Sequence, residues 1–289
     1  QRALAKVGYG QPISSKTIEA LPHAIYVTSN LGGYELLARL QRTSSARLAD
    51  LIDRDGIQRG VTPDLKDAFI VSSQTIRQEK LEATHVRLTL TGGRHIKRDY
   101  IAYDDLYWIY TTSSDDFAAI PNICRYIQKF KNRITCPEVK SRKHALCALH
   151  RARDARIFDK PEKIVGVITE DEIVVARDTR RTVPTDGVYL FGLKNEVNSR
   201  YICGLLNSRL FVFLYRLLAV ETGRVMAQVK SPNLLVLPVR SGGVGHDVRH
   251  NELRDEVVGL VTTIEERGQK LANDNLTMPD REKKQRQLD

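Results

Sequence analysis

The most apolar stretch of this chain is ICGLLNSRLFVFLYRLLAV, residues 202–220. It is about as long as a membrane-spanning helix. However, it contains Arg209 and Arg216, and each would cost about 2.5–3.5 kcal/mol near the centre of a bilayer. No short neighbouring loop carries the biased charge that orients a helix in a membrane. We therefore predict a core helix of the protein at this place, with no membrane as partner.

The spacing within the stretch supports a single long helix with a basic margin. Its large apolar side chains then share one stripe, and both arginines fall on a neighbouring edge. Gly204 allows another element to pack closely, whereas Asn207 and Ser208 form a polar break that needs hydrogen-bond partners if it is buried. The stripe consists of Ile202, Leu206, Leu210, Phe213 and Leu217.

Strand-like and helix-like segments alternate in groups around this stretch. Runs of β-branched and aromatic residues predict strands, and apolar residues at helical spacing predict amphipathic helices. Pro238 is expected to end the last strand or to place it at a sheet edge. The predicted strands are 24–28, 67–72, 86–90, 106–112, 163–169, 172–177, 187–193 and 233–239, and the predicted helices are 33–41, 46–52, 120–134 and 252–272. The expected fold class is α+β (mixed α/β), with sheets, packed helices and a C-terminal helical segment.

The charge balance suggests a polyanionic partner. The 289 residues include 45 Lys and Arg against 35 Asp and Glu, a net charge of +10, and the pI is about 9.5. The C-terminal region from Arg249 onward is close to neutral, so the surplus does not come from the tail. Basic residues are concentrated instead at 125–133 and 140–163. A surplus in the middle of a folded region is typical of a binding face for nucleic acid.

The sequence offers little sign of a metal or disulfide site. Its four cysteines, Cys124, Cys136, Cys147 and Cys203, are scattered and form no CxxC pair. This usage fits a reduced, cytoplasmic protein. We therefore expect no metal and no cofactor in this chain.

Familiar catalytic motifs are also missing. There is no G-x-S-x-G, Walker or H-E-x-x-H sequence. PDLK at 63–66 and PEVK at 137–140 each match part of the acid-x-lysine element of metal-dependent nucleases, whose carboxylates hold Mg²⁺. A magnesium-dependent DNA nuclease using Asp64 and Glu138 therefore stays open as an alternative.

Several segments, taken in order, resemble the C-terminal specificity domain of TaqI-like adenine-specific DNA methyltransferases. RGVTPDLKDAFIV is similar to the family's opening G-I-x-T-G-x-N-x-A-F-I element, and TGGRHIKRDYI to its G-R-D-I-x-R-Y element. Next, IPNICRYIQKFKNRI resembles its P-x-x-x-x-Y-L-x-x-x-K-x-x-L helix and FDKPEKIVGV its P-K-I-V strand. The apolar stretch resembles L-L-G-L-L-N-S-K-L, and NLLVLPV the closing L-x-x-L-P-I. The six segments span about residues 46–240.

The sequence departs from the family pattern at four places. Asp64 stands where the family usually has Gly, and Lys66 where it often has Asn. His95 replaces the usual acid. An aromatic expected before ARDARIF is replaced by Ala145 or Leu146.

The resemblance implies a division of labour between two domains. In that family an N-terminal domain binds S-adenosylmethionine and uses an N-P-P-Y motif to hold a flipped adenine. This chain contains no such motif, so we expect the cofactor and the catalysis in a separate methyltransferase domain. The expected organisation is a connector at 1–45, a DNA target-recognition domain at 46–240, and a linker with a C-terminal helix and polar tail at 241–289.

The expected function is therefore sequence-specific recognition of double-stranded DNA in a prokaryotic cytoplasm, as part of restriction–modification and phage defence. A specificity subunit of a multisubunit restriction system is the closest alternative. The motif residues expected to have structural roles are Gly60, Thr62, Ala68, Phe69, Asn207, Ser208 and Pro238. The candidate DNA-binding residues are Arg94, Lys97, Arg98, Lys129, Lys131, Arg133, Lys140, Arg142, Lys143, Arg151, Arg153, Arg156, Arg180, Arg181 and Arg209.

Overall fold

The apolar stretch folds as two helices and not as the single helix predicted from its periodicity. In the computed structural model, which describes residues 31–219, 227–241 and 248–273, α10 (Ser199–Asn207) and α11 (Arg209–Leu218) meet at a bend of 67°. Ser208 causes the break: its backbone is extended, and its hydroxyl accepts a hydrogen bond from the Phe211 amide. It is the N-cap of a new helix, a role for which serine is preferred.

The break changes which apolar residues are buried. Leu210 and Phe213 of the predicted stripe are 43% and 37% exposed, whereas Phe211 and Tyr215 are buried. The predicted stripe is thus wrong at Leu210 and Phe213, because the second helix starts with a new phase and direction, whereas Leu217 at its end is buried as predicted. Within the described residues no single helix is long and apolar enough to cross a membrane; α10 and α11 pass that test only as a bent pair, and most of their residues are buried.

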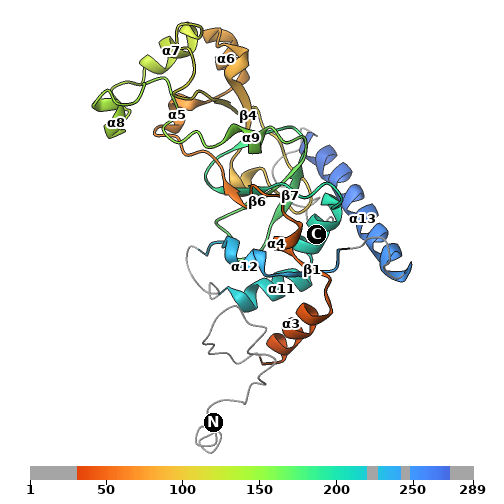
Figure 1. The fold of residues 1–289 in the computed structure, drawn as a ribbon. Helices are drawn as coiled ribbons and strands as arrows, with labels where there is room; N and C mark the ends of the chain where they lie inside the picture. The colour runs from red at the N-terminus through yellow and green to blue at the C-terminus, as the bar shows by residue number, and fades with distance from the viewer. Residues whose placement is uncertain (1–30, 220–226, 242–247, 274–289) are drawn as a thin grey trace, which may run out of the picture.

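The close packing predicted at Gly204 is confirmed. α10 lies against the long C-terminal helix α13 (Val248–Asn273), and a β-carbon on Gly204 would come within 2.7 Å of Val257 and 2.8 Å of Val261. Figure 1 shows α13 running along one side of the lower lobe. The opening helix α3 (Leu31–Thr43) packs against α11, and the Tyr34 hydroxyl donates to the Leu217 carbonyl at 2.6 Å.

The described residues also form three small sheets (Figure 1). The first is antiparallel and has the order β2-β9-β6-β7; β2 is Gln58–Arg59, β6 Lys163–Val167, β7 Val175–Asp178 and β9 Val188–Phe191. The second has the order β3-β5-β4-β8, with β4 and β8 parallel; β3 is Ile70–Val71, β4 Val86–Leu90, β5 Tyr107–Ile109 and β8 Val183–Pro184. In the third, β1 (Ala46–Arg47) pairs with β10 (Pro238–Val239).

The buried side chains form two clusters, one for each lobe. The upper cluster surrounds Trp108, Phe69 and Phe158 and includes side chains from several short helices. The lower cluster brings Phe191 of β9 against α3, α10 and α11. The remaining helical segments are α4 (Leu48–Leu51), α5 (Lys66–Phe69), α6 (Ser73–Glu79), η1 (Ala83–His85), η2 (Gly92–Arg94), α7 (Pro121–Gln128), α8 (Pro137–Lys140), α9 (Ala155–Phe158) and α12 (Ser231–Leu235).

The predicted fold class is confirmed, but several local predictions need correction. Residues 67–72 were expected as a strand, yet only Ile70 and Val71 form one, as β3. Residues 67–69 belong to α5, because a helical turn lets the adjacent Ala68 and Phe69 both reach the core. Residues 233–239 form α12 before the short β10, since Pro232 begins a helix readily. Residues 46–52 contribute β1 before α4. The strand predicted at 24–28, the linker from 242 to 247 and the tail from 274 lie outside the described residues.

Candidate nucleic-acid interface

A cleft of about 830 Å³ lies at the tip of the upper lobe, between the end of α7 and the loop that follows α8. Four of its lining residues are cationic, namely Lys131, Lys140, Arg142 and Lys143. We call this site the basic cleft. Its other lining residues are Gln128, Asn132, Ile134, Val139, His144, Ala145 and Leu146, so no carboxylate is among them.

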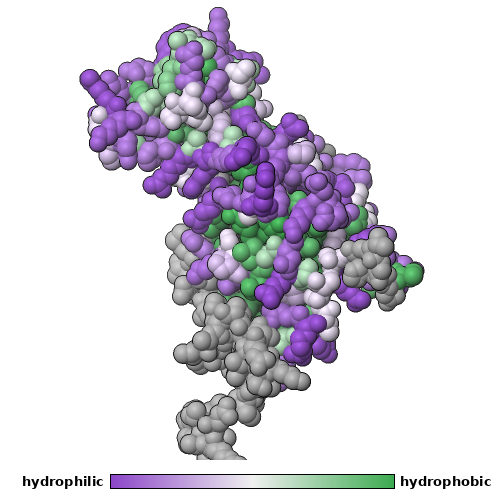
Figure 2. Space-filling model, viewed as in Figure 1, coloured by the Kyte–Doolittle hydropathy of each residue, from purple (hydrophilic) through white to green (hydrophobic). Residues whose placement is uncertain are grey.

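The cations of the basic cleft are available to a partner. All four are exposed, and none makes an ion pair with a carboxylate in the described part of the chain. Gln128 and Asn132 bring amides that can donate to and accept from base edges. The visible face around α8 in Figure 2 is largely hydrophilic. This is the composition expected of a site for a polyanion.

The backbone around α8 explains how the loop is held. The carboxylate of Asp64, from the loop before α5, accepts the amides of Thr135 at 2.9 Å and Cys136 at 3.1 Å. Pro137 then begins α8, and the Glu138 carbonyl accepts the amides of Lys143 and His144. Arg142 adopts a left-handed backbone with φ 59°, a conformation that costs a non-glycine residue about 1 kcal/mol or more.

Other candidate cations are already paired with carboxylates. Arg133 lies 2.5 Å from Asp67, and Lys129 lies 2.6 Å from Glu79. Further ion pairs join Arg94 to Asp104, Arg98 to Glu172 and Arg156 to Asp154. Lys97 donates to the Gly93 carbonyl. These residues contribute less free positive charge than their number in the sequence suggests.

The Arg180–Arg181 turn joins β7 to β8, as its place between two predicted strands indicated. The buried Asp178 carboxylate accepts the amides of Arg180 and Thr182 at 2.8 and 3.0 Å. Burial would raise the pKa of Asp178, but the Lys163 ammonium at 2.6 Å and the Thr182 hydroxyl hold it below its ordinary value. The turn therefore rests on a buried ion pair, which presents its two arginines to solvent.

Arg180 is held by a side-chain contact, whereas Arg181 is distinguished by its backbone conformation. The guanidinium of Arg180 stacks 4.1 Å from the ring centroid of Tyr103, and the backbone of Arg181 is left-handed with φ 52°. Arg151 and Arg153 are exposed in the segment before α9, where Arg153 also has a left-handed backbone (φ 65°). Arg209 is exposed at the start of α11 in the lower lobe. The structure thus does not gather all the predicted cations at one place.

The residues expected to have structural roles have identifiable ones. A β-carbon on Gly60 would collide with the Pro184 and Thr185 carbonyls, and Thr62 forms an antiparallel bridge with Arg151. Ala68 and Phe69 are fully buried, Ser208 caps α11, and Pro238 lies in a two-stranded sheet and hence at an edge.

Asn207 joins three parts of the fold. Its side chain accepts the Val175 amide at 3.0 Å and donates to the Val175 carbonyl at 2.9 Å and to Asp99 at 2.8 Å. Asp99 has a left-handed backbone (φ 65°), and its burial raises the pKa of the carboxyl to about 6 although Asn207 bonds to it. The partners predicted for the polar break are therefore present.

The two carboxylates of the nuclease alternative are both engaged within the upper lobe. Asp64 accepts backbone amides, as described above. Glu138 accepts from Cys136 and lies near His150. A thiol and an imidazole are not the ligands that Mg²⁺ prefers.

The chain belongs to the family of TaqI-like C-terminal specificity domains, because the model of that family matches residues 88–239, more than half of the chain. It is thus a specificity domain of the kind found in restriction–modification enzymes, and the predicted family is confirmed. Among solved structures, the chain is similar to the Type IIL restriction-modification enzyme MmeI in complex with DNA, with 13% identity and a TM-score of 0.49. That match covers 84% of this chain and 32% of the other, so the chain spans about a third of its length. None of the curated proteins matches the sequence.

Proposed function

We propose that this chain recognises a specific sequence in double-stranded DNA as the target-recognition part of an adenine-specific DNA methyltransferase or a fused restriction–modification enzyme. The observation that carries the proposal is the basic cleft, where four cations meet without a carboxylate in the lining. In the setting of a specificity domain, the partner that such a surface fits is the DNA backbone.

The two kinds of cation have different tasks in this proposal. Lys131, Lys140 and Lys143 neutralise phosphates as flexible point charges, and Arg142 offers a planar fork to a phosphate or a guanine edge. Arg180 and Arg181 present further charge from a fixed turn. The remaining candidate residues contribute to the field around the duplex, and sequence is read by the arginines and amides that reach base edges.

The proposal also includes a methyltransferase domain, in the same protein or in a complex with it. S-adenosylmethionine binds to that domain, which modifies the adenine that the specificity domain selects. The site of action is the cytoplasm of a prokaryote, in the context of phage defence. The family supports this part, and no residue of the basic cleft is needed for the chemistry.

Selection from a random duplex library tests the proposal. Bound duplexes are sequenced, and the affinity of the enriched sequence is then measured between 50 and 200 mM salt, the range over which phosphate-binding proteins commonly lose affinity about a thousandfold or more. We expect one short sequence to be enriched and its affinity to fall steeply with salt. Binding without sequence preference, or affinity insensitive to salt, would contradict the proposal. Magnesium-dependent cleavage lost in Glu138→Ala would favour the nuclease instead.

A further inference from the structure

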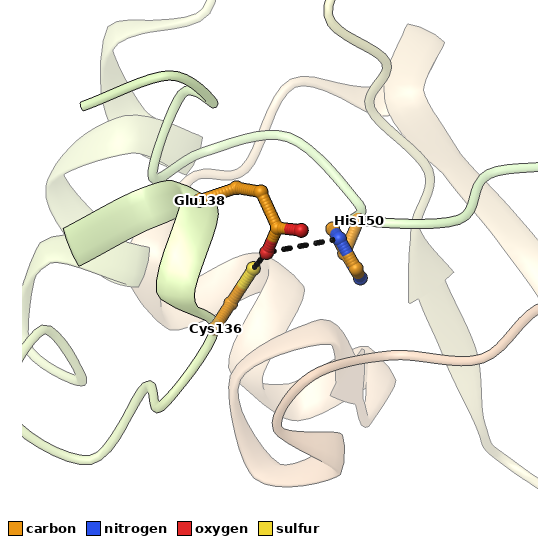
Figure 3. Close-up of side chains that lie close together, drawn as sticks. All are labelled: Cys136, Glu138 and His150. Atoms are coloured by element: carbon orange, nitrogen blue, oxygen red, sulfur yellow. Dashed lines mark hydrogen bonds and ion pairs between the residues drawn. The ribbon is translucent and has the colours of Figure 1, made fainter. Parts of the chain in front are cut away.

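Three potential metal ligands meet beside the basic cleft, at a site that the sequence analysis did not predict. The thiol of Cys136, the carboxylate of Glu138 and the imidazole of His150 have ligand atoms that all lie within 4.8 Å of one another. Figure 3 shows the three side chains pointing toward a common centre, two from the start of α8 and one from the segment before β6.

The distances fit a tetrahedral ion. Zinc bonds of about 2.0–2.3 Å place neighbouring ligand atoms roughly 3.3–3.8 Å apart. The Glu138 Oε2 atom lies 3.2 Å from the Cys136 Sγ and 3.4 Å from the His150 Nε2. These two separations match a shared ion, and the Cys136 Sγ and His150 Nε2 atoms lie within 4.8 Å of each other, so the two outer side chains need only turn toward the common centre.

The chemistry of the ligands selects the metal. A thiolate with an imidazole favours zinc over the hard cations Mg²⁺ and Ca²⁺. Within the described residues the group has three members, which leaves the fourth position of a zinc ion to water. His144 packs edge-on against His150, with ring centroids 5.8 Å apart, and so limits the rotation of the His150 ring.

We propose that Cys136, Glu138 and His150 bind a zinc ion that ties together the two ends of the 136–150 loop. On binding, the Cys136 thiol loses its proton to solvent, and the resulting thiolate bonds to the metal. Lys140, Arg142 and Lys143 lie on this loop, so the ion fixes the segment that supplies most of the charge of the basic cleft. The proposal does not depend on DNA binding, because metal retention is measured on the protein alone.

The buried Cys136 is well placed for this role. Its side chain is 3% exposed, and its amide is held by Asp64, so the thiol has a fixed direction. Glu138 and His150 are more accessible, with side chains 50% and 29% exposed, which gives the ion a path to the site.

The test is metal analysis of the purified chain. We expect about one zinc per chain by inductively coupled plasma mass spectrometry. Replacement by Co²⁺ should produce a thiolate-to-cobalt charge-transfer band, which reports the Cys136 ligand directly. Cys136→Ser and His150→Ala should each lose the zinc and the band, whereas the controls Cys147→Ser and His85→Ala should keep both.

Two further measurements distinguish the loss of a ligand from misfolding of a variant. Circular dichroism shows whether each variant is folded, and Co²⁺ titration of the unmodified chain needs no variant at all. Chelation of the zinc should accelerate amide hydrogen exchange at residues 139–146 relative to α13. The proposal is overturned if the folded chain neither retains zinc nor gives the cobalt band, or if Cys136→Ser and His150→Ala bind as much metal as the controls.

Discussion

The loop around α8 and the β6–β7 ribbon contain the same kinds of charged residue but use them in opposite ways. In the ribbon, Lys163 pairs with the buried Asp178, and Arg177 and Arg200 both bind Glu265 of α13 at 2.9 Å. We call these five residues the central cluster. In the basic cleft the cations have no such partners among the described residues. Positive charge therefore stabilises the fold in one region and is offered to a partner in the other.

The largest effect is expected from breaking the central cluster. Asp178→Ala leaves Lys163 buried without its counter-ion and removes the acceptor for the Arg180 and Thr182 amides. Loss of one partner of a buried pair costs about 3–5 kcal/mol. Urea unfolding measures the change. The control is Asp154→Ala, which removes an exposed ion pair with Arg156 at the N-cap of α9 and should destabilise the chain by about 1 kcal/mol at most.

Removing the charge of the basic cleft should affect DNA binding and leave stability unchanged. The variant Lys131→Gln, Lys140→Gln, Arg142→Gln, Lys143→Gln should bind its duplex about a hundredfold more weakly, with a salt slope smaller by about 3–4. Fluorescence anisotropy gives both quantities.

A matched control has the same change in net charge. Arg94, Lys129, Arg133 and Arg156 each have a carboxylate partner, and their replacement by Gln should weaken binding far less. Equal losses in the two variants would show that the cleft acts only through the net charge of the molecule.

Asp99 should make stability depend on pH. Its pKa is raised from 3.8 to about 6, so the folded state holds the proton more tightly, and the resulting stabilisation is complete below pH 4 and lost as the pH rises through 6. Asp99→Asn keeps an acceptor for Asn207, suits the left-handed backbone and carries no charge. We expect it to be more stable than the unmodified chain by about 3 kcal/mol at pH 8 and nearly equal to it at pH 4. A constant difference across this range would rule out the titration of Asp99 as the cause.

The smallest effect is expected at a paired surface cation. Lys129→Ala removes an ion pair with Glu79 whose side chains are both partly exposed, and such pairs contribute about 0–1 kcal/mol. Thermal unfolding and duplex affinity should both change little. A loss of affinity as large as that of the single variant Lys131→Gln would remove the distinction between paired and unpaired cations.

The sequence predicted elements whose signal is local. Strands β4, β6 and β9 and helices α3 and α13 follow from their own residues, and the packing at Gly204 follows from its lack of a side chain. The break at Ser208 was not predictable from periodicity, because whether a serine interrupts or begins a helix depends on what the two halves pack against.

Whether a cation is free to bind a partner also depends on residues far away in the sequence. Arg133 is paired with Asp67, 66 residues earlier, and Arg98 with Glu172, 74 residues later. A count of basic residues cannot distinguish these cations from Lys140 or Lys143. Cys136 and His150 are also brought together only by the way the loop between them closes. Their distance along the sequence therefore did not predict a shared metal site.

Chemical footprinting of lysines tests the central claim most directly. The chain is acetylated with and without its saturating duplex, and the modified positions are quantified by mass spectrometry. The account predicts that Lys131, Lys140 and Lys143 become strongly protected by DNA while the neighbouring, paired Lys129 reacts at nearly the same rate. Equal reactivity of Lys131, Lys140 and Lys143 with and without a bound duplex would contradict it.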